Sequence, residues 1–96
     1  MKIGNHEWTI KIVSRNEINN CDGRTKPNDL EILIADDLKG QTRQITFLHE
    51  LTHAILDEQG RCYDKNTTIE NMCEFIGWNF EEIERCLNEF VEEIGL

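Results

Sequence analysis

The sequence predicts an α+β domain in which a short N-terminal sheet, antiparallel or mixed, precedes two helices. Residues 7–14 alternate between apolar and polar side chains, which is typical of a half-buried strand, and residues 30–35 form a second apolar run. Apolar residues then recur at three- and four-residue steps through 42–58 and 67–94, which indicates two amphipathic helices. Because 96 residues can bury one modest core, we expect residues 1–96 to form a single domain.

Turn-forming residues divide the N-terminal part of the chain. Residues 19–23 end in Asp-Gly, which favours a tight reversal, and residues 26–29 contain the proline. A short strand fits between these two breaks. The next strand, at residues 30–35, is expected to end at Asp36 and Asp37.

The first helix is expected to run from Thr42, a suitable capping residue, to Glu58, with Gly60 as a left-handed terminator. In the second helix, we expect Gly77 to allow a close approach to the first. The apolar side of the second helix is expected to join the core, although part of it also suits a dimer or partner surface. This side comprises Ile69, Met72, Cys73, Ile76, Phe80, Ile83, Leu87, Phe90, Val91 and Ile94.

The most specific motif lies within the first helix, where His49-Glu50-Leu51-Thr52-His53 reads H-E-x-x-H. Residues four apart on a helix lie one above the other, so both imidazoles can reach one metal ion while Glu50 lies a step around the helix. Zinc bound in this way activates a water molecule, and Glu50 would take its proton and pass it on as general base and acid. The motif therefore predicts a zinc hydrolase. The alternative is that these polar residues simply face solvent.

A catalytic zinc site takes a third ligand from the protein. The long form of the motif is excluded, because Leu56 and Gln59 occupy its glycine and third histidine positions. The remaining histidine, His6, lies far upstream and is expected at the surface. Glu70 and Glu74 lie one turn apart at the start of the second helix, and either carboxylate can complete the site.

The run TFLHELTHAIL at residues 46–56, followed by the helix opening IENMC at residues 69–73, resembles the minimal gluzincin metallopeptidases of phages and mobile elements, which are related to the ImmA/IrrE group. The resemblance covers residues from about 30 to 80, and its specific part is the H-E-L-T-H-A core. Known zincins commonly add a Tyr or His that stabilises the oxyanion. Here Tyr63, in an expected loop, is not assigned to the site.

The resemblance implies a small zincin-like α+β fold and a zinc-dependent peptidase. Its ligands would be His49, His53 and Glu70, with Glu50 as the catalytic base and acid, while Glu74 stays open as an alternative to Glu70. The substrate would be a peptide or protein, such as a cytosolic regulatory protein.

The composition of the chain indicates which kinds of partner it is expected to bind. Lys and Arg total 10 against 19 Asp and Glu, a formal net charge of −9, so direct nucleic-acid binding is not expected. Without a signal peptide or membrane span in the sequence, we expect a cytoplasmic protein with no membrane partner. Cys21, Cys62, Cys73 and Cys86 are then expected to be reduced, with Cys73 and Cys86 in the core.

Three classes of function stay open from the sequence. The first is a zinc metallopeptidase. The second is a zinc-binding protein without turnover, which acts as a partner-binding module. The third is an ordinary structural or interaction domain in which the motif is accidental.

Overall fold

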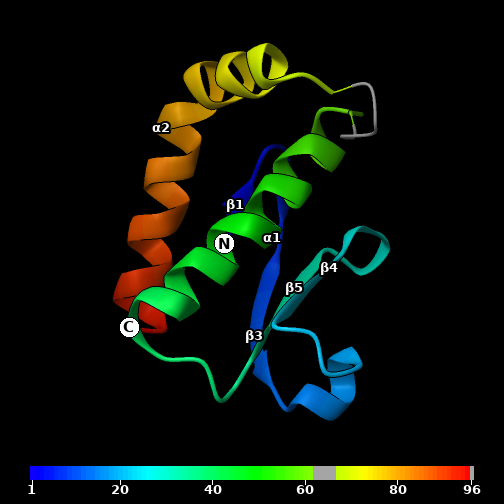
Figure 1. Ribbon diagram of the computed structural model, residues 1–96, viewed down its shortest axis with the longest axis vertical. Coiled ribbons are helices and arrows are strands. Elements are labelled where there is room, and N and C mark those ends of the chain that lie inside the picture. The colour runs from blue at the N-terminus through cyan, green and yellow to red at the C-terminus, as the bar shows by residue number, and fades with distance from the viewer. Residues whose placement is uncertain (62–66, 96) are drawn as a thin grey trace.

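The computed structural model describes residues 1–61 and 67–95 and confirms the α+β class, with a small sheet and two helices (Figure 1). Two 3-10 turns, Arg15–Ile18 and Pro27–Asp29, flank strand β4. Cys62 and Tyr63 lie outside the described residues. The elements are β1 (Lys2–Ile3), β2 (His6–Glu7), β3 (Thr9–Val13), β4 (Gly23–Lys26), β5 (Glu31–Ala35), α1 (Gly40–Glu58) and α2 (Ile69–Glu93).

The main sheet is mixed and has the strand order β3-β5-β4. The central strand β5 runs parallel to β3, with Ile10 opposite Ile32, and antiparallel to β4, with Arg24 opposite Leu33. Strand β4 is the short strand that fits between the two turn segments, and it forms one edge of the sheet. The separate hairpin of β1 and β2 was not predicted, because strands of two residues are too short to show a period.

Helix α1 begins and ends close to its expected bounds. Its first residue is Gly40, and Lys39 stands at the N-cap without a side-chain hydrogen bond, so the prediction of Thr42 as the cap was wrong. The expected terminator is confirmed: Gly60 has φ +69°, and the N–H of Arg61 donates to the Leu56 carbonyl oxygen at 2.8 Å. Within the described part of the chain, neither helix has the length and apolar character needed to cross a bilayer.

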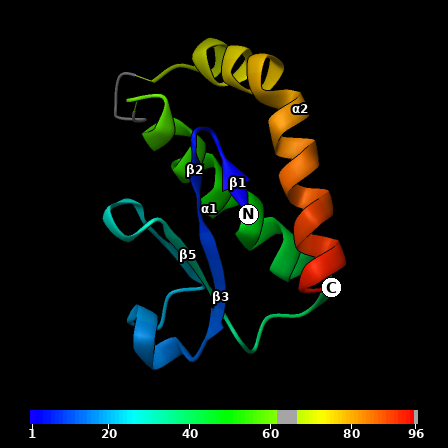
Figure 2. The same ribbon diagram turned by 180° about the vertical axis from the view of Figure 1, so that it is seen from behind.

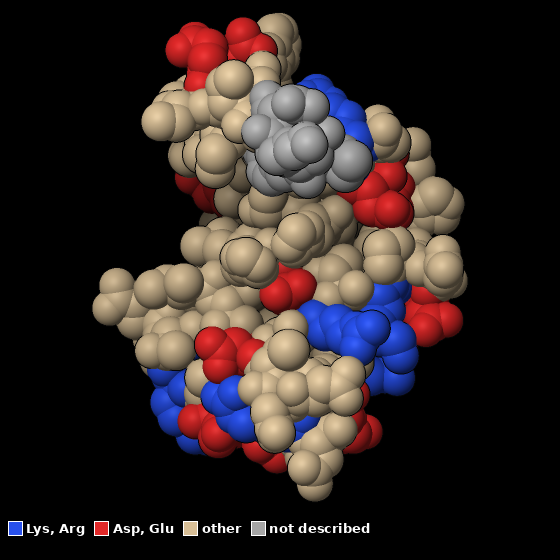
Figure 3. Space-filling model, turned by 45° about the vertical axis from the view of Figure 1, so that its right-hand side comes forward, with Lys and Arg blue, Asp and Glu red and all other residues tan. Residues whose placement is uncertain are grey.

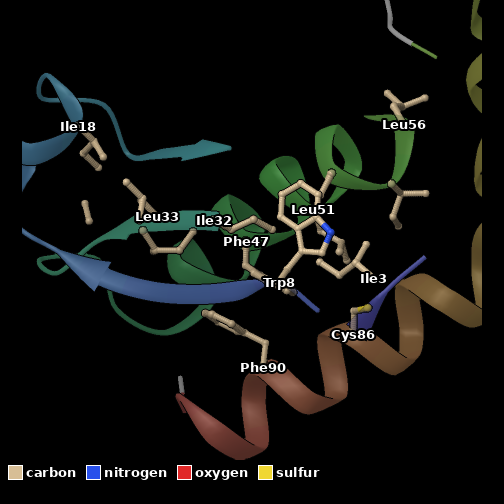
Figure 4. Close-up of a cluster of buried hydrophobic side chains, with 14 of the residues drawn as sticks. Ile3, Trp8, Ile18, Ile32, Leu33, Phe47, Leu51, Leu56, Cys86 and Phe90 are labelled. Atoms are coloured by element: carbon tan, nitrogen blue, oxygen red, sulfur yellow. The ribbon is translucent and has the colours of Figure 1, made fainter. Parts of the chain in front are cut away.

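One apolar cluster joins the hairpin, the sheet and both helices (Figure 4). Phe47 of α1 stacks on Phe90 of α2, with ring centroids 4.1 Å apart and planes inclined by 9°. Cys86 is buried here as expected, and burial raises the pKa of its thiol to about 11, so it stays protonated. The largest fully buried side chains are Trp8, Phe47, Phe75, Phe90, Ile3, Ile18, Ile32, Ile34, Leu51 and Cys86.

Helix α2 changes direction along its length, and its two halves have different surroundings. The second half runs beside α1, whereas the first half lies at the end of the molecule farthest from the sheet (Figures 1 and 2). Phe75 and Asn79 are the buried residues of the first half, and Asn79 Oδ1 accepts a hydrogen bond from Gln59 at 2.6 Å.

The expected apolar side of α2 therefore enters the core only in its second half. In the first half the helix turns the side that carries Phe75 and Asn79 toward α1, and these residues lie on a different side from the apolar stripe. Cys73 is exposed, so its expected place in the core was wrong. Gly77 was also wrongly expected to allow close packing, because a Cβ there would meet nothing within 4 Å.

Glu58 joins the end of α1 to the N-terminal hairpin. Its side chain is 6% exposed and accepts hydrogen bonds from Trp8 Nε1 at 3.0 Å and from the Asn5 N–H at 3.3 Å. His6, exposed as expected, places Nδ1 2.8 Å from the carboxylate. Burial by itself raises the pKa of Glu58, but the hydrogen bonds from His6, Trp8 and Asn5 outweigh it and hold the pKa below its usual value of 4.5.

Replacing this carboxylate tests how far it stabilises the fold. Glu58→Gln should lower the free energy of unfolding at pH 7 by about 1–3 kcal/mol, measured by urea denaturation, because an amide is a weaker acceptor for these donors. A lowered folded-state pKa means that the carboxylate stabilises the protein above pH 4.5 and loses this effect as the pH falls through the lowered value. The two proteins should therefore converge in acid.

The exposed Glu93→Gln provides the control, with an expected change below about 0.5 kcal/mol. Equal stability of Glu58→Gln and wild type at pH 7 would contradict this role for Glu58.

Candidate metal centre

The two imidazoles of the H-E-x-x-H motif lie side by side on the outer side of α1, as the four-residue spacing predicts. The ring centroids of His49 and His53 are 5.0 Å apart, with planes inclined by 71°, and both side chains are exposed. This orientation follows from the opposite side of the helix, where buried apolar residues fix its rotation: Phe47, Leu51, Ala54 and Ile55. The rings can thus approach one metal ion from a single helix face.

Glu50 lies between α1 and the edge strand β4 and is 8% exposed. Thr25 Oγ1 is 2.8 Å from Glu50 Oε1 and 2.9 Å from the Glu50 carbonyl oxygen. Because a hydroxyl carries one proton, Thr25 donates to one of these oxygens at a time. The second carboxylate oxygen, Oε2, lies 3.9 Å from His49 Nε2. Thr25 therefore orients the carboxylate so that one oxygen lies on the side of the imidazoles.

Gly23 brings β4 close enough to α1 for these contacts. A Cβ at Gly23 would lie 2.9 Å from Thr46 Cγ2, 3.0 Å from Glu50 Cγ and 3.1 Å from the Leu33 carbonyl oxygen. Real Cβ atoms essentially never show the first of these distances, so a larger residue would push the strand and the helix apart. The glycine is needed here for space.

Two pockets adjoin Glu50 along the line where β4 meets α1. The larger, about 410 Å³, includes His53, and the smaller, about 340 Å³, includes His49; Gly23 and Glu50 line both. The larger pocket is lined by Gly23, Arg24, Thr25, Pro27, Glu50, His53, Leu56, Asp57 and Arg61. Figure 3 shows the molecule hollowed between its upper part, which holds the start of α2, and its lower part, which holds the sheet.

Arg24 and Arg61 give the larger pocket a positive side in an otherwise acidic protein. Within residues 1–61 and 67–95, neither guanidinium forms an ion pair. A guanidinium binds a carboxylate through two parallel hydrogen bonds, so this part of the pocket can hold an acidic group. Asp57 lines the same pocket, and its carboxylate repels a group that carries a large negative charge.

The structure does not bring the expected third ligand to the two imidazoles. Glu70 and Glu74 are both exposed at the start of α2, and the described residues contain no group of three or more His, Cys, Asp or Glu side chains placed to hold a metal ion. A catalytic zinc ion takes three protein ligands. The donor chemistry of His49 and His53 thus fits two of the three positions, and the third is not assembled in this arrangement.

Sequence reasoning missed three residues that β4 contributes to the site, and it missed Arg61, which follows α1. Gly23 was noted only as part of a turn, and Thr25, Arg24 and Arg61 carried no motif. Their approach to Glu50 depends on how the edge strand packs against α1, which no local pattern reports.

Two glycine substitutions distinguish the close approach at β4 from ordinary glycine flexibility. Gly23→Ala should lower the free energy of unfolding by about 1–3 kcal/mol, because the added methyl group overlaps Thr46 and the Leu33 carbonyl. Gly77→Ala is the matched control: it meets nothing within 4 Å, and alanine in a helix interior should stabilise the protein by about 0.5–1 kcal/mol. Urea denaturation measures both. Full stability of Gly23→Ala would show that β4 does not lie this close to α1.

No protein-family model, curated protein or solved structure matches this chain. Its function is therefore inferred from the residues of this site: two neighbouring imidazoles, a carboxylate oriented by an edge strand, and the pockets that adjoin them.

Proposed function

We propose that the protein is a zinc-dependent metallopeptidase of the minimal gluzincin type. One observation carries the proposal: the imidazoles of His49 and His53 lie side by side, and beside His49 lies the buried carboxylate of Glu50, whose orientation is set by a hydrogen bond from β4. If the motif merely faced solvent, Glu50 would need neither burial nor a partner on another element. Burial of a charged group is costly unless it is hydrogen-bonded, so this placement favours a role for the carboxylate.

His49 and His53 would hold the metal, and Glu50 would move the proton. Zinc supplies Lewis acidity, which polarises a peptide carbonyl and makes a water molecule easier to deprotonate. Glu50 accepts the proton of that water as general base and delivers it to the leaving amine as general acid. With Oε1 held by Thr25, the proton is received at Oε2, on the side of His49. The hydrogen bond and the surrounding packing keep the carboxylate from rotating away.

The edge strand β4 offers a way to align a peptide substrate. On the side away from β5 it pairs with no strand of the described residues. An extended peptide can add to such an edge through backbone hydrogen bonds, and it would then pass the pockets that contain His53 and His49. Arg24 and Arg61 favour a substrate that carries an acidic side chain near the cleaved bond.

Glu70 is the proposed third ligand, with Glu74 as the alternative. Either choice requires the start of α2 to move toward His49 and His53 when the metal binds. Such a movement would displace two buried residues of this half of the helix, Phe75 and Asn79.

Metal content tests the site directly. Purified wild-type protein, freed of loosely held ions, should contain near one zinc ion per chain by elemental analysis, and His49→Ala should lose it. Loss in Glu70→Ala or in Glu74→Ala then identifies the third ligand. His6→Ala is the control and should keep its zinc, since His6 pairs with Glu58 at the hairpin. A folded wild type that takes up no zinc would refute the proposal and leave an interaction domain.

Cleavage separates catalysis from metal binding. Glu50→Gln should keep the zinc and the fold but lower the rate of peptide hydrolysis by at least about 100-fold, because the amide cannot accept the proton. A peptide library that includes acidic residues, read by mass spectrometry, supplies the substrates. If the zinc-loaded wild type cleaves none of them, the second class of function, a zinc-binding module without turnover, is favoured instead.

A further inference from the structure

The first half of α2 exposes a line of large apolar side chains. Ile69, Met72, Ile76 and Phe80 are 81, 44, 53 and 56% exposed. Their spacing of three, four and four residues places them along one side of the helix, and we call them the α2 stripe. Single exposed apolar residues are ordinary, whereas larger contiguous apolar patches are typical of interaction sites.

The charges around the stripe indicate what kind of molecule this is. Residues 67–84 contain five glutamates and neither lysine nor arginine. Four of the five, which lie exposed, form no ion pair within the described residues: Glu70, Glu74, Glu81 and Glu84. The fifth, Glu82, pairs with Arg85 and accepts a hydrogen bond from the Gly4 N–H. The stripe thus lies on a helix segment whose free charges are all negative.

We infer that the α2 stripe is a docking surface for a basic, apolar segment of a partner protein. Apolar side chains of that segment would cover Ile69, Met72, Ile76 and Phe80. Its Lys or Arg side chains would pair with Glu81 and Glu84, the free carboxylates that the proposed zinc site does not require. An amphipathic helix that carries lysines beside its apolar line has this chemistry. The inference rests on exposure and charge alone and does not depend on the proposed peptidase activity.

A second copy of the chain is a poor occupant for the same surface. Pairing stripe against stripe would bring two sets of free glutamates together, and neither copy has a lysine or arginine in residues 67–84 to offset them. Like charges facing each other across an interface oppose association. Charge complementarity therefore points to a partner of the opposite sign.

Two labelled peptides of the same apolar sequence test the charge requirement. One carries leucines at helical spacing flanked by lysines, and the other has glutamate in place of every lysine. Fluorescence anisotropy with the wild-type protein should show binding of the lysine peptide that weakens as salt is added, and no binding of the glutamate peptide. Equal affinity for both peptides would overturn the inference.

Matched variants test where the lysine peptide binds. Ile76→Ser should weaken binding by about tenfold, because it removes a large apolar contact. Ile45→Ser changes a side chain that is similarly exposed, 58%, but lies on α1, and should leave the affinity unchanged. The pair Glu81→Gln and Glu84→Gln, combined in one protein, should reduce the affinity. The same change at the exposed Glu92 and Glu93 should not. Equal effects within either matched set would overturn the location.

Two further measurements test whether a second copy of the chain, or the chain itself, covers the α2 stripe. Sedimentation of the wild type should show a monomer; a dimer that Ile76→Ser dissociates would mean that a second copy covers the stripe. One equivalent of zinc should leave peptide binding intact. If zinc abolishes the binding, the stripe is covered by the chain itself when the start of α2 moves, and the inference is wrong.

Discussion

The close contact between the edge strand β4 and helix α1 is the constraint on which the site depends. At Gly23 the two elements approach so nearly that an added methyl group would lie 2.9 Å from Thr46 Cγ2 and 3.0 Å from Glu50 Cγ, both on α1. This approach brings the Thr25 hydroxyl within hydrogen-bonding distance of Glu50, and it also forms the walls of both pockets. A wider separation would leave Glu50 exposed to solvent and free to rotate.

Helix α1 serves the core and the site at once. Its apolar side is fixed by the sheet and by the stacking of Phe47 on Phe90, so the rotation of the helix about its axis is set by packing. Because this rotation is fixed, the outer side of the helix is fixed as well, and His49 and His53 both face solvent there. A site built on a rigid helix in this way holds its groups more precisely than a loop does.

The two halves of helix α2 have different roles, one in the core and one at the surface. Its second half contributes Cys86 and Phe90 to the core, whereas its first half is anchored by Phe75 and Asn79 and leaves a line of apolar side chains exposed. The same segment carries Glu70 and Glu74, one of which is the third ligand of the proposed zinc site. The proposed zinc site needs this half of the helix to move, whereas the proposed docking surface needs only the exposed apolar line.

The sequence by itself determined the α+β class, the strands β3 and β5, the termination of α1 at Gly60, and the placement of His49 beside His53. These features follow from local backbone geometry, in which residues two apart share a face of a strand and residues four apart share a face of a helix. Tertiary structure decided the rest. The contact of Thr25 with Glu50, the side of α2 that turns toward α1, and the distance of Glu70 from the imidazoles depend on packing between segments far apart in the chain. Periodicity carries no information about such packing, because one apolar stripe can be buried against a neighbour or left for a partner.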